Sequence, residues 1–152
     1  MRRSVLTVAL VVAATAFLGS GTATAAPATQ VVINATVDFE TGVGSFVAVG
    51  GGVCRSGATS DVSVVRPLGG IITFDVHKTF TCADGSGTFT LRIFAGVHPC
   101  ARFNSGVWRV AAGTGAYETL SGSGQLVGSY LPADSCTATS VDDHLTGKMQ
   151  LG

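Results

Sequence analysis

Apolar and polar residues alternate along four long stretches of the chain, 31–40, 71–80, 88–97 and 139–151. In the first stretch the odd positions from Val31 to Phe39 are apolar, and Asn34, Thr36 and Asp38 lie between them. A period of two is typical of a β-strand that turns one face toward a core and the other toward water. The pattern therefore predicts a strand over each of these stretches.

Shorter runs of the same kind predict further strands near 43–49, 62–66, 105–112 and 122–130. The sequence Asp84-Gly85-Ser86-Gly87 joins two of the long stretches and is a clear hairpin turn. Eight strands joined by turns rich in Gly, Ser, Pro and Asp favour an antiparallel sheet, and closing that sheet removes its exposed edges. We therefore expect an all-β fold, a single eight-stranded antiparallel β-barrel, with a two-sheet sandwich as the alternative.

The N-terminus has the features of a secretory signal peptide. Arg2 and Arg3 precede an apolar run from Val5 to Leu18, and small residues then lead to Ala25. This run is shorter than the roughly 18 apolar residues that a membrane-spanning helix needs. We expect residues 1–25 to be removed by general secretion, which leaves residues 26–152 as one extracellular β-barrel domain with no membrane contact.

Four cysteines lie in the predicted mature chain, and an even number in an exported protein indicates two disulfides. Pairing Cys54 with Cys82 and Cys100 with Cys136 keeps each bridge local, although the spacing leaves the other two pairings open. Zinc would need a tighter grouping of cysteine and histidine than this sequence has, so no metal is expected.

Charge narrows the range of partners. The whole chain has nine basic and nine acidic residues, and loss of Arg2 and Arg3 makes the mature chain slightly acidic. Nucleic acids and anionic membrane surfaces are therefore disfavoured. The glycine-rich runs lack the following helix and basic residue of a phosphate-binding loop, and no Gly-x-Ser-x-Gly elbow occurs, so no cofactor is expected.

Two charged residues interrupt the apolar faces of the predicted strands. Lys78 is in register with Val76 and Phe80, and Asp143 is in register with Val141 and Leu145. A buried lone charge is costly, so each should find a partner, a ligand or water. In one interpretation strand ends or bulges let both reach solvent. In the other they are the polar handle of an apolar pocket, with Trp108 and Tyr130 as its walls.

A sharp turn is predicted after the strand that contains Trp108. Gly113 and Gly115 are suited to positive φ angles, and Thr114 between them can hydrogen-bond locally. Residues 116–120 can form one helical turn, which would place Tyr117 and Leu120 against an apolar surface.

The segment 108–124 resembles the signature turn of the allene oxide cyclase barrel superfamily, which includes the plant dirigent proteins and small secreted actinobacterial proteins. The resemblance implies a barrel that holds a reactive substrate in one folded shape, which is an isomerase or cyclase activity, and relatives that associate as dimers or trimers. It thus adds a homo-oligomer to the possible partners. The matching residues, all of them scaffold positions, are Trp108, Gly113, Thr114, Gly115, Tyr117, Leu120, Gly122 and Gly124.

A barrel of eight strands is either filled by side chains or just wide enough for one small ligand. We therefore expect a secreted barrel that binds a small hydrophobic molecule in its lumen. The alternatives are a cyclase or dirigent-type protein that guides the stereochemistry of a reactive substrate, and an extracellular structural or interaction protein with a filled barrel.

Overall fold

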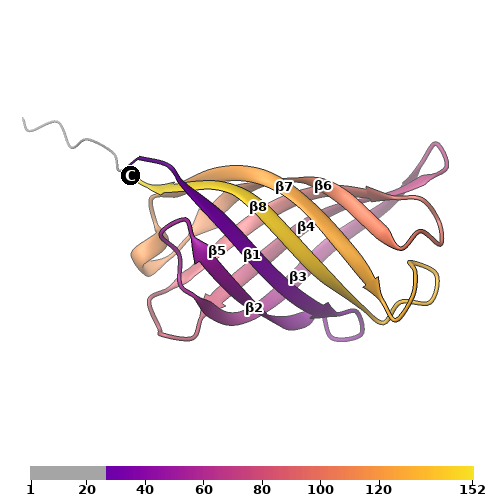
Figure 1. The fold of residues 1–152 in the computed structure, drawn as a ribbon, viewed down its shortest axis with the longest axis horizontal. Coiled ribbons are helices and arrows are strands. Elements are labelled where there is room, and N and C mark those ends of the chain that lie inside the picture. The colour runs from indigo at the N-terminus through magenta and orange to yellow at the C-terminus, as the bar shows by residue number, and fades with distance from the viewer. Residues whose placement is uncertain (1–26) are drawn as a thin grey trace, which may run out of the picture.

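A computed structural model describes residues 27–152, which form a closed barrel of eight antiparallel strands (Figure 1). Each strand pairs with the next along the chain, and β8 pairs with β1. The predicted barrel is confirmed, whereas the predicted signal peptide, 1–25, lies outside the described residues. The strands are β1 (Thr29–Asp38), β2 (Val43–Gly50), β3 (Ser56–Leu68), β4 (Ile71–Cys82), β5 (Thr88–Val97), β6 (Phe103–Gly113), β7 (Leu120–Leu131) and β8 (Ser140–Leu151).

The alternating residues take the faces that their period predicts. On β1 the side chains of Val31, Ile33 and Val37 are buried inside the barrel. Phe39 was expected to continue this face, but it is 46% exposed because the strand ends at Asp38 and the chain then turns. Its ring instead lies at the rim of the barrel, 6.1 Å from the ring of Tyr130.

β3 is much longer than the sequence predicted. It begins at Ser56 rather than near residue 62, and it pairs with β2 along its first part and with β4 from Gly57 to Leu68. Its early residues are small and polar, so they lack the apolar alternation of a strand. Pairing on both sides overrides that weak local preference.

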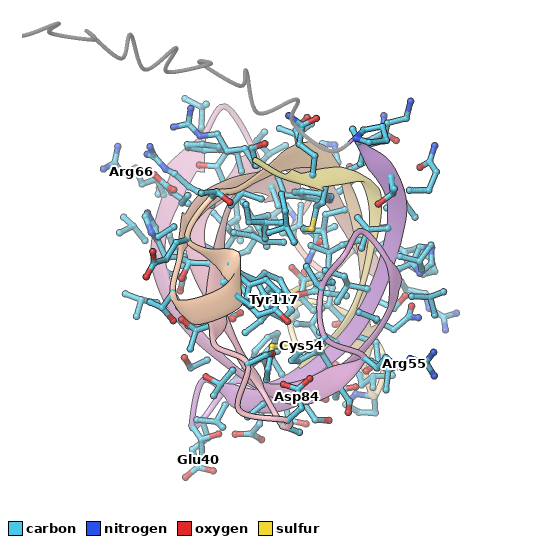
Figure 2. The ribbon with its side chains drawn as sticks, turned by 90° about the vertical axis from the view of Figure 1, so that its left-hand side faces the viewer. Glu40, Cys54, Arg55, Arg66, Asp84 and Tyr117 are labelled. Atoms are coloured by element: carbon cyan, nitrogen blue, oxygen red, sulfur yellow. A yellow bond between two sulfur atoms is a disulfide. The ribbon has the colours of Figure 1, made fainter. Side chains whose placement is uncertain are left out.

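Aromatic side chains fill one end of the barrel, here called the packed end. The rings of Phe80 and Phe89 stack with centroids 4.7 Å apart, and Phe46 meets Phe80 edge to face at 5.0 Å. Tyr117 covers them from the turn between β6 and β7, and Figure 2, which looks at this end, shows it near the middle with Cys54 and Asp84 beside it. These rings pack directly against one another and fill this end of the lumen.

The turn at 113–117 agrees with its prediction in part. A 3-10 helix, Gly115–Tyr117, follows β6, and both Tyr117 and Leu120 are buried as expected. Gly115 has a φ of +59°, but Gly113 is not among the residues with positive φ, so that expectation is wrong. Gly113 is needed for space, because a Cβ there would collide with the carbonyl oxygen of Tyr117.

Thr114 agrees with its prediction in part: its carbonyl oxygen accepts a local hydrogen bond from the backbone N–H of Tyr117, at 3.1 Å, but its side-chain hydrogen bonds are not local. Its hydroxyl accepts a hydrogen bond from the backbone N–H of Thr88, at 3.0 Å, and lies 2.9 Å from the Thr88 hydroxyl. The residue therefore ties the turn to the start of β5 across the packed end.

The disulfides lie at opposite ends of the barrel, and both have the favoured pairing. Cys54, in the loop after β2, is bonded to Cys82 at the end of β4, on the packed end. Cys100 and Cys136 join the β5–β6 and β7–β8 loops at the other end. In Figure 1 these two loops and the projecting β3–β4 turn are at the right-hand end, opposite the C-terminus.

Candidate functional site

A cavity of about 470 Å³ occupies the half of the lumen that the aromatic rings do not fill. The inward-facing residues of β4 follow one another from the opening of the cavity to its floor. Ile72, Phe74 and Val76 form its wall, Lys78 lies at its floor, and Phe80 beyond the floor belongs to the packed end. Loop residues Phe39 and Ser135 lie at its rim, so the cavity opens at the end that carries the Cys100–Cys136 bridge. We call this the open end.

The floor of the cavity is an ionic cluster of Asp61, Lys78 and Asp143, here called the floor cluster. The Lys78 ammonium nitrogen lies 2.8 Å from Oδ2 of Asp61 and 3.0 Å from Oδ2 of Asp143, and the lysine side chain is 1% exposed. Asp61 is the direct cross-strand partner of Lys78, whereas Asp143 comes from β8. The interpretation in which Lys78 and Asp143 reach solvent is therefore wrong, since they pair inside the barrel.

Burial dominates the electrostatics of both carboxyl groups. It raises the pKa of Asp61 and of Asp143 above the ordinary value, and the neighbouring Lys78 ammonium acts in the opposite direction on each. Two carboxylates around one ammonium have an excess of negative charge when all three groups are ionised. The floor cluster is therefore poorly suited to accept another anion.

One oxygen of the floor cluster has no partner. Oδ2 of Asp61 accepts the hydrogen bond from Lys78, but Oδ1 is buried and accepts none from any residue in 27–152. The hydroxyl of Thr59, two residues earlier on β3, is also buried without a partner in the same part of the chain. Buried polar atoms are usually hydrogen-bonded, so Oδ1 of Asp61 marks an unfilled acceptor position.

A second polar pair lies on the wall above the floor. The Asn104 side-chain amide donates to the Tyr130 hydroxyl at 3.1 Å, and its oxygen accepts from the backbone N–H of Gly128, also at 3.1 Å. Gly128 makes room for this arrangement, because a Cβ there would lie 2.6 Å from Oδ1 of Asn104 and 2.8 Å from Oδ1 of Asp143. Burial raises the pKa of Tyr130.

The four residues predicted to line the lumen do not all meet. Lys78, Asp143 and Tyr130 line the cavity, and Trp108 does not. The Trp108 indole N–H donates to the carbonyl oxygen of Gln125 at 3.0 Å, and its ring packs where a Cβ on Gly124 or Gly147 would otherwise lie. Trp108 thus belongs to the packed core rather than to the cavity wall.

Sequence reasoning missed Asp61 and Asn104. Asp61 lies just before the short strand that was predicted at 62–66, and its inward neighbours Thr59 and Ser63 are polar, so no apolar register marked it. Asn104 precedes the stretch predicted at 105–112. Extending the stretch at 105–112 by one residue and keeping its period of two would have placed Asn104 on the inward face of Trp108. At Asp61 the same rule fails, because the apolar residues of that short stretch, Val62 and Val64, face outward.

The chemistry available here is that of apolar walls above a polar floor. Within residues 27–152, no group of three His, Cys, Asp or Glu side chains is arranged to hold a metal ion. The same part of the chain contains no helix with the length and hydrophobicity that crossing a membrane requires. The cavity can enclose an apolar body, and its floor can orient one polar group.

Comparison with family models, with curated protein sequences and with solved structures found no match to this chain in any of the three. The geometry of the cavity is therefore the basis for assigning a function.

Proposed function

We propose that this protein binds a small hydrophobic molecule in the lumen of its barrel. The observation that carries the proposal is the cavity of about 470 Å³, which lies within the range of roughly 300–1,000 Å³ that is usual for small-molecule sites. Its walls are mainly apolar, and its few polar groups are gathered at the floor and at Asn104 and Tyr130. This is the usual composition of a site that encloses an apolar ligand and fixes its orientation.

The contrast between the two ends of the barrel supports binding over a purely structural role. At the packed end the lumen is filled by aromatic side chains that contact one another. Unfilled apolar volume costs stability, because the side chains around it lose packing contacts. A lumen that is filled at one end and hollow at the other is better explained by a ligand than by a filled structural barrel.

We further propose that the protein acts outside the cell. The sequence pattern of residues 1–25 predicts export, and the two disulfides are compatible with an oxidising compartment.

Titration with Nile red, a neutral apolar dye whose fluorescence rises in dry surroundings, tests the proposal. The wild type should bind the dye, and Val76→Phe, which places a ring in the cavity, should weaken that binding at least about tenfold. Val62→Phe is the matched control, because Val62 lies on the outside of β3 and is 73% exposed. Failure of the wild type to bind, or equal loss in both variants, contradicts a lumenal site.

A second candidate function is a cyclase or dirigent-type protein that guides the stereochemistry of a reactive substrate. It is favoured by three groups that face the cavity with a raised pKa, Asp61, Tyr130 and Asp143. Titratable groups with perturbed pKa values in a cavity are typical of acid–base catalysis. The test is to generate an allene oxide in the presence of the protein and measure the enantiomeric ratio of the cyclised product. A racemic product at saturating protein excludes this activity for that substrate.

A further inference from the structure

We infer that the ligand presents a neutral hydroxyl group to the cavity floor, where it donates to Asp61 and accepts from Lys78. The inference rests on the proposed function, since it names the class of molecule that the lumen would hold: an apolar alcohol. It is carried by the hydrogen-bonding vacancies of the floor cluster, by its charge, and by the walls above it.

The first vacancy is an acceptor. Oδ1 of Asp61 is buried and has no hydrogen-bond donor within residues 27–152, although the Asp61 side chain is part of the cavity lining. Leaving a buried carboxylate oxygen unpaired is unfavourable, and a donor that arrives with a ligand relieves the penalty. A hydroxyl hydrogen at the cavity floor supplies that donor.

The second vacancy is a donor on the neighbouring side chain. A lysine ammonium has three N–H groups, and Lys78 has a carboxylate oxygen of Asp61 and one of Asp143 as its two partners. One N–H therefore has no partner in the described structure, and it can donate to the oxygen of the same hydroxyl. A hydroxyl is the simplest neutral group that both donates and accepts, so it can satisfy both vacancies at once.

The charge around the cavity disfavours a carboxylate in this position. Of the residues that line the cavity, all of them within 27–152, Lys78 alone is a cation, and it is already paired with two carboxylates. Asp38 adds a further negative side chain among the lining residues. An anionic ligand would meet repulsion with no unpaired cation to offset it. An ammonium could donate to Asp61, but it could not accept from Lys78.

The cavity walls indicate the chemistry of the rest of the ligand. Ile72, Phe74, Val97 and Val141 surround the space above the floor, so the body that carries the hydroxyl should be apolar. Long-chain alcohols, amines and acids of one length are therefore suitable probes, because they differ only in the group that reaches the floor.

The experiment is displacement of Nile red from the wild type by 1-decanol, decylamine and decanoate, with the alcohol kept below its solubility limit and the two charged probes below their micelle concentrations. At about pH 7.5 the amine and the acid are both charged, while the alcohol is neutral. Decanol should bind at least about tenfold more tightly than decanoate, with decylamine between them. An equal or reversed order of decanol and decanoate overturns the inference.

A substitution at Asp61 tests whether the floor cluster causes the preference for decanol over decanoate. Asp61→Asn replaces one carboxylate oxygen by an NH₂ donor and removes a negative charge, so the decanol-to-decanoate ratio should fall at least about tenfold. Asp75→Asn makes the same change on the outside of β4, where Asp75 pairs with Arg92, and should leave the ratio unchanged. An unchanged ratio in a folded D61N protein contradicts the role of Asp61, and the wild-type ranking decides the matter if D61N does not fold.

The two proposals fail in different ways. If the dye does not bind at all, the lumenal site itself is wrong, and the hydroxyl inference falls with it. If the dye binds and is displaced by all three probes with equal affinity, the site stands and only the inference about the hydroxyl is overturned.

Discussion

Lys78 has both of its ionic partners on other strands, and all three side chains lie inside the barrel. Such a cluster contributes little net stability in itself, because desolvation offsets much of the attraction between the charges. Its members nevertheless depend on one another. Removing the single cation would leave two buried carboxylates facing each other with nothing between them.

We therefore expect Lys78→Met, which keeps most of the side-chain volume, to reduce the free energy of unfolding by about 3–5 kcal/mol, the usual effect of breaking a buried ion pair. Urea denaturation followed by far-ultraviolet circular dichroism measures this change. The loss should shrink in acid, because protonation of Asp61 and Asp143 removes their repulsion.

Lys148→Met provides the matched control, because Lys148 is an exposed lysine on the outer face of β8. Its effect should stay within about 0.5 kcal/mol, as for most surface substitutions. Similar stabilities for the two variants would show that the floor cluster does not depend on its lysine.

Asp143 allows a prediction about pH. Burial raises its pKa in the folded state above the ordinary value of 3.8, so over the interval between the two values the folded protein binds more protons than the unfolded chain. Stability contributed by this group is therefore present in acid and is lost as the pH rises through the folded pKa. The free energy of unfolding of the wild type relative to Asp143→Asn should fall over that interval, as measured by urea denaturation at a series of pH values.

Asp75 should show the opposite sign. Hydrogen bonds from Arg92 lower the pKa of Asp75, so its contribution is lost as the pH falls through the folded value. The wild type relative to Asp75→Asn should therefore lose stability toward acid. Curves of the same sign for both variants would contradict the assignment of one carboxyl to a buried site inside the barrel and the other to a half-buried ion pair on its outer face.

A residue of the candidate site could be predicted from the sequence only where the apolar alternation of its strand showed which face points inward. Lys78 and Asp143 interrupt apolar faces, so the alternation itself marked them as inward-facing. The inward neighbours of Asp61 are the polar Thr59 and Ser63, whereas the apolar Val62 and Val64 face outward, so the alternation did not mark Asp61 as inward-facing. That the charges meet depends on barrel closure, which brings β8 opposite β4, and no local pattern contains that information.

At the scale of the strands, Gly128 of β7 sets how closely Asn104 and Asp143 approach. A Cβ at this position would lie within 2.8 Å of both side chains, so Gly128→Ala forces one of them to move. We expect a loss of about 1–3 kcal/mol in the free energy of unfolding, as is usual for overpacking, together with weaker dye binding. Thermal denaturation and the Nile red titration measure the two effects.

Gly96→Ala is the control for this prediction. The atoms nearest to a Cβ on Gly96 are 3.7 Å and 3.8 Å away, which is ordinary contact. Gly96 of β5 pairs with Ser105 of β6, and Gly128 pairs with Asn104 of the same strand, so the two glycines lie at a similar level of the barrel. This substitution should change stability little and leave dye binding intact. Equal effects of the two alanines would mean that loss of glycine flexibility, rather than displacement of Asn104 and Asp143, is responsible.

Among the elements, the long alternating strands were predictable, because a half-buried strand imposes a period of two on its sequence. β3 was only partly predictable. Its first residues, from Ser56 to Asp61, include one β-branched side chain, Thr59, and show no apolar alternation. They are held in the sheet by pairing with β2 and β4. The turn at Gly113 was located correctly, but steric contact with Tyr117 determines the need for that glycine rather than its φ angle.

For the molecule as a whole, the two disulfides have similar spacing but different positions. The residues they join are 28 and 36 apart, so each should stabilise the fold by about 3–4 kcal/mol on the chain-entropy model. The Cys100–Cys136 bridge, however, joins loops at the open end. We expect the double serine variant at 100 and 136 to release bound dye faster, which stopped-flow fluorescence measures, because the loops around the opening become more mobile.

The double serine variant at 54 and 82 should lose comparable stability without changing the dissociation rate, because that bridge lies at the packed end. Faster release from both variants would indicate that overall loosening of the barrel, rather than the loops at the open end, controls exchange of the ligand.

The pairing of β1 with β8 also constrains when the protein can fold. Residues 29–38 find their partners at 140–149, more than a hundred positions further along the chain, and one member of the floor cluster, Asp143, is in that last strand. Until β8 has been synthesised, β1 and β7 are open edges and Lys78 lacks one of its carboxylates. The barrel can therefore close only after nearly the whole chain has been synthesised. A chain that ends before residue 140 lacks β8 and cannot form the closed barrel.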